Sequence, residues 1–211
     1  RDRNNIIKSK QEEMRMQYYI YSLVCFLLPG TVWLIWNKGM IADKAYKVRH
    51  IIWIYIYLFY GYLAVQEAAG IGTIWDLIAY GKLDNSINLI PFSSEGSMTY
   101  ILNIIMFMPL GFLLPLIWKN FRNAKKVVLM GFLMSLAIEI CQLFNIRTTD
   151  IDDLMMNTLG TLVGYCCWKV FSLIFRNAGT KCVEMKKSEP VIYMFGGILG
   201  LFLLYNWRVF N

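Results

Sequence analysis

The polar residues with the clearest capacity for chemistry gather between two apolar segments of this 211-residue chain. Glu139 and Gln142 lie within the first of these segments, where an acid is costly unless it faces a helix bundle or a wet cavity. A carboxylate there could act as a general acid or base, or it could bind a ligand. The cluster continues into the second segment with Arg147, Asp150, Asp152, Asp153 and Asn157.

Helical spacing predicts that these residues share two faces. Ser135, Glu139 and Gln142 are separated by four and then three positions, so they lie on one side of a helix. The following helix carries a second stripe, which consists of Asp150, Asp153, Asn157, Gly160 and Gly164. The two glycines have G-x-x-x-G spacing, which predicts close packing against another helix. We therefore expect the acids and the packing seam on the same side of that helix.

Structural roles are open for several of these residues. Asp150 at a helix start would cap the unpaired N–H groups of the first turn. Arg147 could simply pair with one of the three neighbouring Asp side chains. Asn103, in another apolar segment, and Gln142 could serve only as hydrogen bonds between helices. Glu139 could likewise belong to a structural pair, although an acid within a membrane helix is a functional candidate by default.

The composition predicts an all-α, polytopic membrane helix bundle. Hydrophobic residues make up 57% of the chain and charged residues 17%, whereas soluble domains carry about 25% charged residues. The net charge of +7 falls mainly in short connections between apolar runs. A nucleic-acid binder would instead need a continuous basic face with exposed aromatic side chains. We therefore expect no nucleic-acid partner, and nothing in the chain indicates a cofactor.

Six apolar segments have a length suited to a bilayer core, which needs roughly 20 helical residues. They are residues 17–36, 51–69, 100–118, 127–145, 154–175 and 191–207. Pro29 and Gly30 interrupt the first segment. The alternative is therefore five spans plus a re-entrant or interfacial N-terminal segment. In the long connection 67–98, Gly70 and Gly72 should end the preceding helix and residues 74–80 should form a short one.

Charge in the connections predicts the orientation. The connections 37–49, 119–126 and 176–189 are rich in Lys and Arg, which indicates the cytoplasmic side. The connection 67–98 and the turn around Arg147 are acidic, which places the polar cluster on the extracellular side of a multi-pass protein of the cell membrane. The basic residues before position 17 do not fit this alternation. His50, beside Arg49, is expected at the membrane interface.

Four ordered motifs resemble the VanZ-like family: Asn88-Leu-Ile-Pro-Phe, Asn103-Ile-Ile-Met-Phe-Met-Pro-Leu-Gly111, Ser135-x-x-x-Glu139-x-x-Gln142, and Asp150-x-x-Asp153-x-x-x-Asn157-x-x-Gly160. The resemblance runs from about Ile51 to the C-terminus, so it divides the chain into an N-terminal extension, 1–50, and a membrane domain, 51–211. Asp152 is an extra acid beside the matching pair. The resemblance implies a Gram-positive cell-envelope protein associated with resistance to teicoplanin and other lipoglycopeptides.

Two functional hypotheses follow. In the first, a non-catalytic protein reduces drug access through an outward-facing pocket that binds a membrane lipid headgroup, a lipid-linked cell-wall precursor or the lipoglycopeptide. In the second, a membrane enzyme acts on an isoprenoid or phospholipid headgroup, with Glu139 and Asp153 as acid/base candidates. Asp150 and Asp153 are then weak candidates for a metal, and Arg147 for a phosphate. The candidate binding residues are Asn88, Asn103, Glu139, Gln142, Arg147, Asp150, Asp153 and Asn157.

Overall fold

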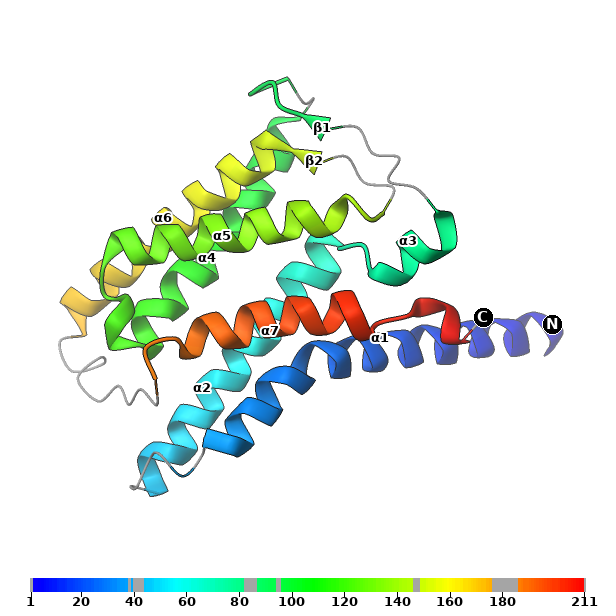
Figure 1. Ribbon diagram of the computed structural model, residues 1–211, viewed down its shortest axis with the longest axis horizontal. Helices are drawn as coiled ribbons and strands as arrows, with labels where there is room; N and C mark the ends of the chain where they lie inside the picture. The colour runs from blue at the N-terminus through cyan, green and yellow to red at the C-terminus, as the bar shows by residue number, and fades with distance from the viewer. Residues whose placement is uncertain are drawn as a thin grey trace.

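The computed structural model describes residues 2–37, 39, 44–81, 87–93, 96–145, 149–175 and 186–210, and these are almost all helical (Figure 1). The α-helices of this part of the chain are α1 (Asp2–Asn37), α2 (Lys44–Tyr62), α3 (Ile74–Tyr80), α4 (Ser97–Ile117), α5 (Ala124–Gln142), α6 (Ile151–Ile174) and α7 (Glu189–Leu204). A π-helix, η2 (Leu63–Ala69), continues α2, and 3-10 turns η3 (Lys119–Phe121) and η4 (Trp207–Phe210) follow α4 and α7. Two short strands, β1 (Ile87–Asn88) and β2 (Thr149–Asp150), pair in parallel.

All six segments predicted as spans are helical, and three of them are long and apolar enough to cross a membrane: Lys8–Asn37, Tyr46–Gln66 and Met98–Ile117. α7 has 16 residues, which is short of the roughly 20 that a bilayer core needs. α5 and α6 carry the polar cluster and lysines among their apolar residues. Crossing by these three helices stays a prediction, as does the division of the chain at residue 50.

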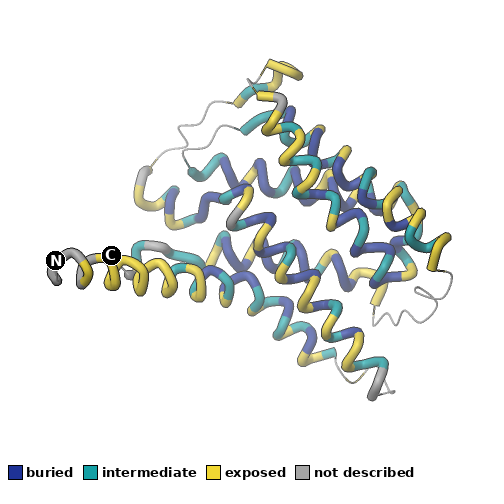
Figure 2. Tube along the Cα trace, turned by 180° about the vertical axis from the view of Figure 1, so that it is seen from behind, coloured by how far each residue is buried: buried dark blue, intermediate teal, exposed yellow. Residues whose placement is uncertain are grey.

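α1 is a continuous helix through Pro29, so the chain forms no hairpin at Pro29–Gly30. The proline has no N–H for the carbonyl of Cys25. Gly200 of α7 covers this carbonyl, because a Cβ at Gly200 would overlap the Cys25 oxygen and lie 2.9 Å from Pro29 Cγ. α1 and α7 lie side by side (Figure 1), whereas the first turns of α1 extend past the bundle and are exposed (Figure 2).

α4 and α6 approach until their backbones touch. A Cβ on any of three glycines would overlap a backbone carbonyl oxygen of the facing helix: Gly111 against Thr161, Gly160 against Ile104, and Gly164 against Met108. On α5, Gly131 makes room in the same way for the Thr161 side chain. The predicted packing role of the G-x-x-x-G spacing is confirmed, and the seam fixes the start of α6 against the start of α4.

The connection after α2 follows the predicted breaks. Gly70 has a left-handed φ of 64° and ends η2. A Cβ on Gly72 would lie 2.6 Å from the backbone carbon of Phe144, so only glycine allows the chain to pass the end of α5 here. α3 then occupies the expected residues 74–80. Its Trp75 donates from Nε1 to the Leu203 carbonyl at 3.0 Å, which ties it to the end of α7.

Asp152 anchors the rest of this connection. It is fully buried, and its two carboxylate oxygens accept hydrogen bonds from Phe92 N at 2.7 Å and from the Tyr100 hydroxyl at 2.8 Å. Beside it, Asn88 of β1 pairs with Asp150 of β2. Asp152, which is not part of the motifs that resemble the VanZ-like family, therefore holds the 87–93 segment and α4 to the start of α6.

A second buried polar cluster lies where α2 and α7 begin and α4 ends. Glu189 has no exposed surface and accepts hydrogen bonds from Trp118 Nε1 at 3.0 Å and from the Tyr193 hydroxyl at 3.2 Å. His50 Nε2 lies 2.8 Å from Glu189 Oε1. The His50 side chain is thus a partner for the buried acid, and its place at the membrane interface stays a prediction.

We expect Gly164→Leu to separate α4 from α6 and to lower the free energy of unfolding by at least about 1–3 kcal/mol, since a side chain has no space at the backbone contact. Thermal unfolding of the purified protein in detergent measures this. Cys166→Leu is the matched control, because it enlarges an exposed side chain of the same helix. Equal melting temperatures for the two variants would contradict the packing role.

We expect Asp152→Ala to destabilise the protein by about 2–4 kcal/mol, because it leaves two hydrogen-bond donors without their acceptors. The loss should also raise amide hydrogen exchange in residues 88–93, whose attachment it removes. Asp152→Asn keeps one acceptor oxygen and should lose less stability. If both variants exchange like the unchanged protein in this segment, Asp152 is not its anchor.

Candidate functional site

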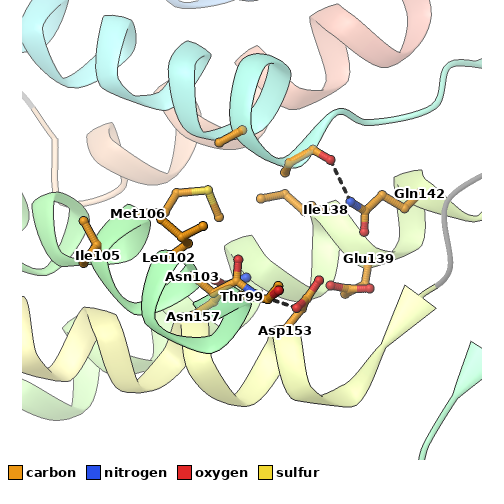
Figure 3. A pocket seen from close by; sticks show the side chains of 12 residues that line it. Thr99, Leu102, Asn103, Ile105, Met106, Ile138, Glu139, Gln142, Asp153 and Asn157 are labelled. Atoms are coloured by element: carbon orange, nitrogen blue, oxygen red, sulfur yellow. Dashed lines mark hydrogen bonds between the residues drawn. The ribbon is translucent and has the colours of Figure 1, made fainter. Parts of the chain in front are cut away.

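A cavity of about 770 Å³ opens where η2, α4, α5 and α6 meet, at the end of the bundle that carries β1 and β2 (Figure 3). Five of the predicted site residues line it: Asn103, Glu139, Gln142, Asp153 and Asn157. The rest of the lining consists of apolar side chains and Thr99. Residues separated by more than 50 positions therefore share one partly apolar chamber with a few polar groups, the usual composition of a small-molecule site.

The close contact between α4 and α6 brings together the first polar pair of the cavity, Asn103 and Asp153. Asn103 directly precedes Ile104, whose backbone contacts Gly160, and it donates from Nδ2 to Asp153 Oδ1 at 2.5 Å (Figure 3). Thr99 lies four residues before Asn103 and therefore on the same face of α4. The partly exposed Asp153 carboxylate is thus oriented by a neighbouring helix while it still faces the cavity.

Glu139 enters the cavity from the last turns of α5. It is 5% exposed, and its Oε2 accepts a hydrogen bond from the backbone N–H of Asp150 at 3.1 Å. The Thr149 hydroxyl donates to the Glu139 carbonyl at 3.3 Å. These bonds tie the end of α5 to the strand that precedes α6. In Figure 3 the carboxylates of Glu139 and Asp153 point toward one another.

The amide side chains of Gln142 and Asn157 each donate one hydrogen bond to another part of the protein. Gln142 Nε2 donates to the carbonyl of Ala69 at 2.9 Å, at the end of η2. Asn157 Nδ2 donates to Ser135 Oγ at 2.9 Å, across the α5–α6 contact. Asn157 Oδ1 is buried and has no hydrogen-bond partner within the described part of the chain. The predicted links between helices are therefore present, and Asn157 keeps an acceptor beside the cavity.

Asn88 and Asp150 lie beside the cavity and not in its lining. Asp150 is the N-cap of α6, as its Oδ1 accepts from Asp152 N at 2.9 Å. Its Oδ2 accepts from Asn88 Nδ2 at 3.1 Å. The capping interpretation of Asp150 is thus confirmed. Arg147 lies outside the described residues.

Sequence reasoning missed Thr99 and the role of Asp152. The spacing of four between Thr99 and Asn103 was available as a signal. Helical spacing did separate Asp153, on the stripe with Asn157, from Asp152, but the partners of Asp152 could not be predicted because Phe92 and Tyr100 are more than 50 positions away. In the described residues, no three His, Cys, Asp or Glu side chains come together in a metal-binding arrangement.

Comparisons with known proteins agree with the motifs. The VanZ/LLP1 family profile matches residues 18–173, from within α1 to the last turn of α6, and includes every residue of the cavity lining. Protein VanZ of Enterococcus faecium is 34% identical over 134 residues, which are 63% of this chain and 77% of that protein. No solved structure matches the chain. With three helices able to cross a membrane and a family match over most of its length, the chain is a membrane protein that belongs to the VanZ/LLP1 family.

Proposed function

We propose that this protein reduces susceptibility to teicoplanin and related lipoglycopeptides, and that its polar cavity binds a lipid headgroup, a lipid-linked cell-wall precursor or part of the drug. The main support for this proposal is one cavity in a VanZ/LLP1 protein that is lined by five polar residues: Asn103, Glu139, Gln142, Asp153 and Asn157. The association with teicoplanin is inferred from the resemblance to the family, and the binding site is inferred from the geometry of the cavity. We place the cavity on the extracellular side because of the charge of the connections.

The size of the cavity limits its ligand. About 770 Å³ lies within the usual range of roughly 300–1,000 Å³ for small-molecule sites. A headgroup with the upper part of its chains fits this space, as does the acyl tail of a lipoglycopeptide, whereas a whole glycopeptide does not. Apolar residues such as Leu102, Ile105 and Met106 would contact the chain, and the polar group would lie toward Glu139 and Asp153.

Hydrogen bonding limits the ligand further. One N–H of each of Asn103, Gln142 and Asn157 donates to a protein acceptor, whereas Asn157 Oδ1 is a buried acceptor without a partner among the described residues. A buried acceptor without a partner costs about 1–3 kcal/mol. A ligand that brings an N–H or O–H group would remove that cost once the side chains that cover this oxygen move aside. Amine, hydroxyl and amide groups of headgroups, precursors or the drug all meet this requirement.

The enzyme alternative is favoured by one observation, the two carboxylates that point toward one another in the cavity (Figure 3). Such a pair can divide acid and base roles. Turnover of an undecaprenyl or phospholipid substrate by the purified protein, with or without divalent metal, and its loss in Glu139→Gln, would establish this function. Full teicoplanin protection by a protein without any turnover would exclude it.

Glu139→Gln and Asp153→Asn should each abolish protection against teicoplanin in a susceptible strain that expresses the protein. Each replaces a carboxyl group by an amide and so removes an acceptor oxygen, which weakens ligand binding by about 10- to 100-fold. Minimum inhibitory concentrations measure protection, and immunoblots of membranes verify equal protein amounts. Glu12→Gln, on the exposed start of α1, is the control with the same charge change. Unchanged protection in both cavity variants would refute the assignment of the site.

A second comparison separates ligand binding from packing at Asn157. Both Ser135→Ala and Asn157→Leu break the bond between these two side chains, but only Asn157→Leu removes the buried acceptor Oδ1. We expect Asn157→Leu to lose teicoplanin protection and Ser135→Ala to keep it, at equal membrane levels. If Ser135→Ala loses as much protection, Asn157 acts only through helix packing.

A further inference from the structure

A second cavity lies at the opposite end of the bundle, between the last turns of α1 and the first turns of α7. Its volume is about 470 Å³, and it is lined by residues of α1 between Pro29 and Asn37, by Ile192 and Gly196 of α7, and by Lys186, which precedes α7. The stretch from Pro29 to Asn37 is about 12 Å long at 1.5 Å per residue. None of these residues belongs to the Glu139–Asp153 cavity.

The inner part of this groove is apolar. Gly196 has no side chain, and a Cβ there would lie 3.4 Å from Pro29 Cβ, so the glycine keeps the space beside the proline open. Val32 and Trp36 flank the groove and are 51% and 86% exposed. An apolar channel of this kind in a membrane-exposed surface suits the upper part of an acyl chain.

The outer part of the groove is cationic and aromatic. Lys186 Nζ lies 6.0 Å from the centre of the Trp33 ring, where the ring and the ammonium attract each other. Trp and Lys side chains together are typical of the membrane interface. Among the described residues, the exposed charges of this end of the bundle are all basic: Arg49, Lys119, Lys125, Lys126, Lys169, Lys186 and Lys187.

We propose that the α1–α7 groove binds an anionic phospholipid, with an acyl chain along Pro29 and Gly196 and the phosphate at Lys186. The charge of this end favours an anionic headgroup over a zwitterionic one, and basic pockets between membrane helices are known to hold such headgroups. The proposal is independent of the function of the Glu139–Asp153 cavity, because the two cavities share no residue.

Native mass spectrometry of the full-length protein in detergent tests this with phosphatidylglycerol and phosphatidylcholine of identical acyl chains. We expect preferential binding of phosphatidylglycerol, and an approximately fivefold loss of this preference in Lys186→Ala, the usual contribution of one Lys near an anionic surface. Lys187→Ala is the matched control, since it removes the same charge one residue outside the groove. Gly196→Leu, which fills the apolar part, should weaken binding of both lipids.

Three results would overturn the proposal. Equal binding of the two lipids would show that no anionic site exists. Equal losses in Lys186→Ala and Lys187→Ala would reduce the effect to general surface charge. Stabilisation by inorganic phosphate alone that depends on Lys186, with phosphatidylglycerol binding unaffected by Gly196→Leu, would indicate a site for free phosphate and not for a lipid.

Discussion

The backbone contact between α4 and α6 is the constraint on which the rest of the structure depends. Glycines on both helices remove the side chains that would hold the axes apart, and this close approach brings Asn103 within hydrogen-bond distance of Asp153. α5 then packs on α6 through Gly131 and Thr161, which places Glu139 and Gln142 at the same end. The polar residues meet because small residues elsewhere let the helices approach.

Four acids that form hydrogen bonds within this bundle, Glu139, Asp152, Asp153 and Glu189, fall into two groups. Asp152 and Glu189 have no exposed surface, and each accepts hydrogen bonds from more than one side chain or backbone N–H. Acids with such partners are stabilised in an apolar interior and hold segments together. Glu139 and Asp153 also bond to the protein, but they line a cavity large enough for a ligand. The adjoining space, and not burial alone, separates the functional candidates from the structural ones.

Much of this organisation could be predicted from periodicity and hydropathy. The six apolar segments are helical, Ser135, Glu139 and Gln142 share the buried face of α5, and Gly160 and Gly164 form a packing seam. The pairing of β1 with β2 could not be predicted, because strands of two residues carry no periodic signal. Nor could the contact of His50 with Glu189, which joins residues 139 positions apart. Local sequence patterns determine which residues share one face of a helix, whereas tertiary packing determines which helix faces contact each other.

The two cavities differ in a way that follows from the helices around them. At one end, α4, α5 and α6 converge with acids and amides near their ends, so a few polar groups line an otherwise apolar cavity. At the other end, the acid Glu189 is paired with His50, Trp118 and Tyr193, and the exposed charges among the described residues there are basic. Pro29 adds an open groove between α1 and α7, because its ring lies against Gly196 and Gly200 where larger side chains would otherwise pack. A single helix bundle thus carries a cavity with two acids at one end and a groove beside basic residues at the other, and Asp152 and Glu189 hold the helices together at the two ends.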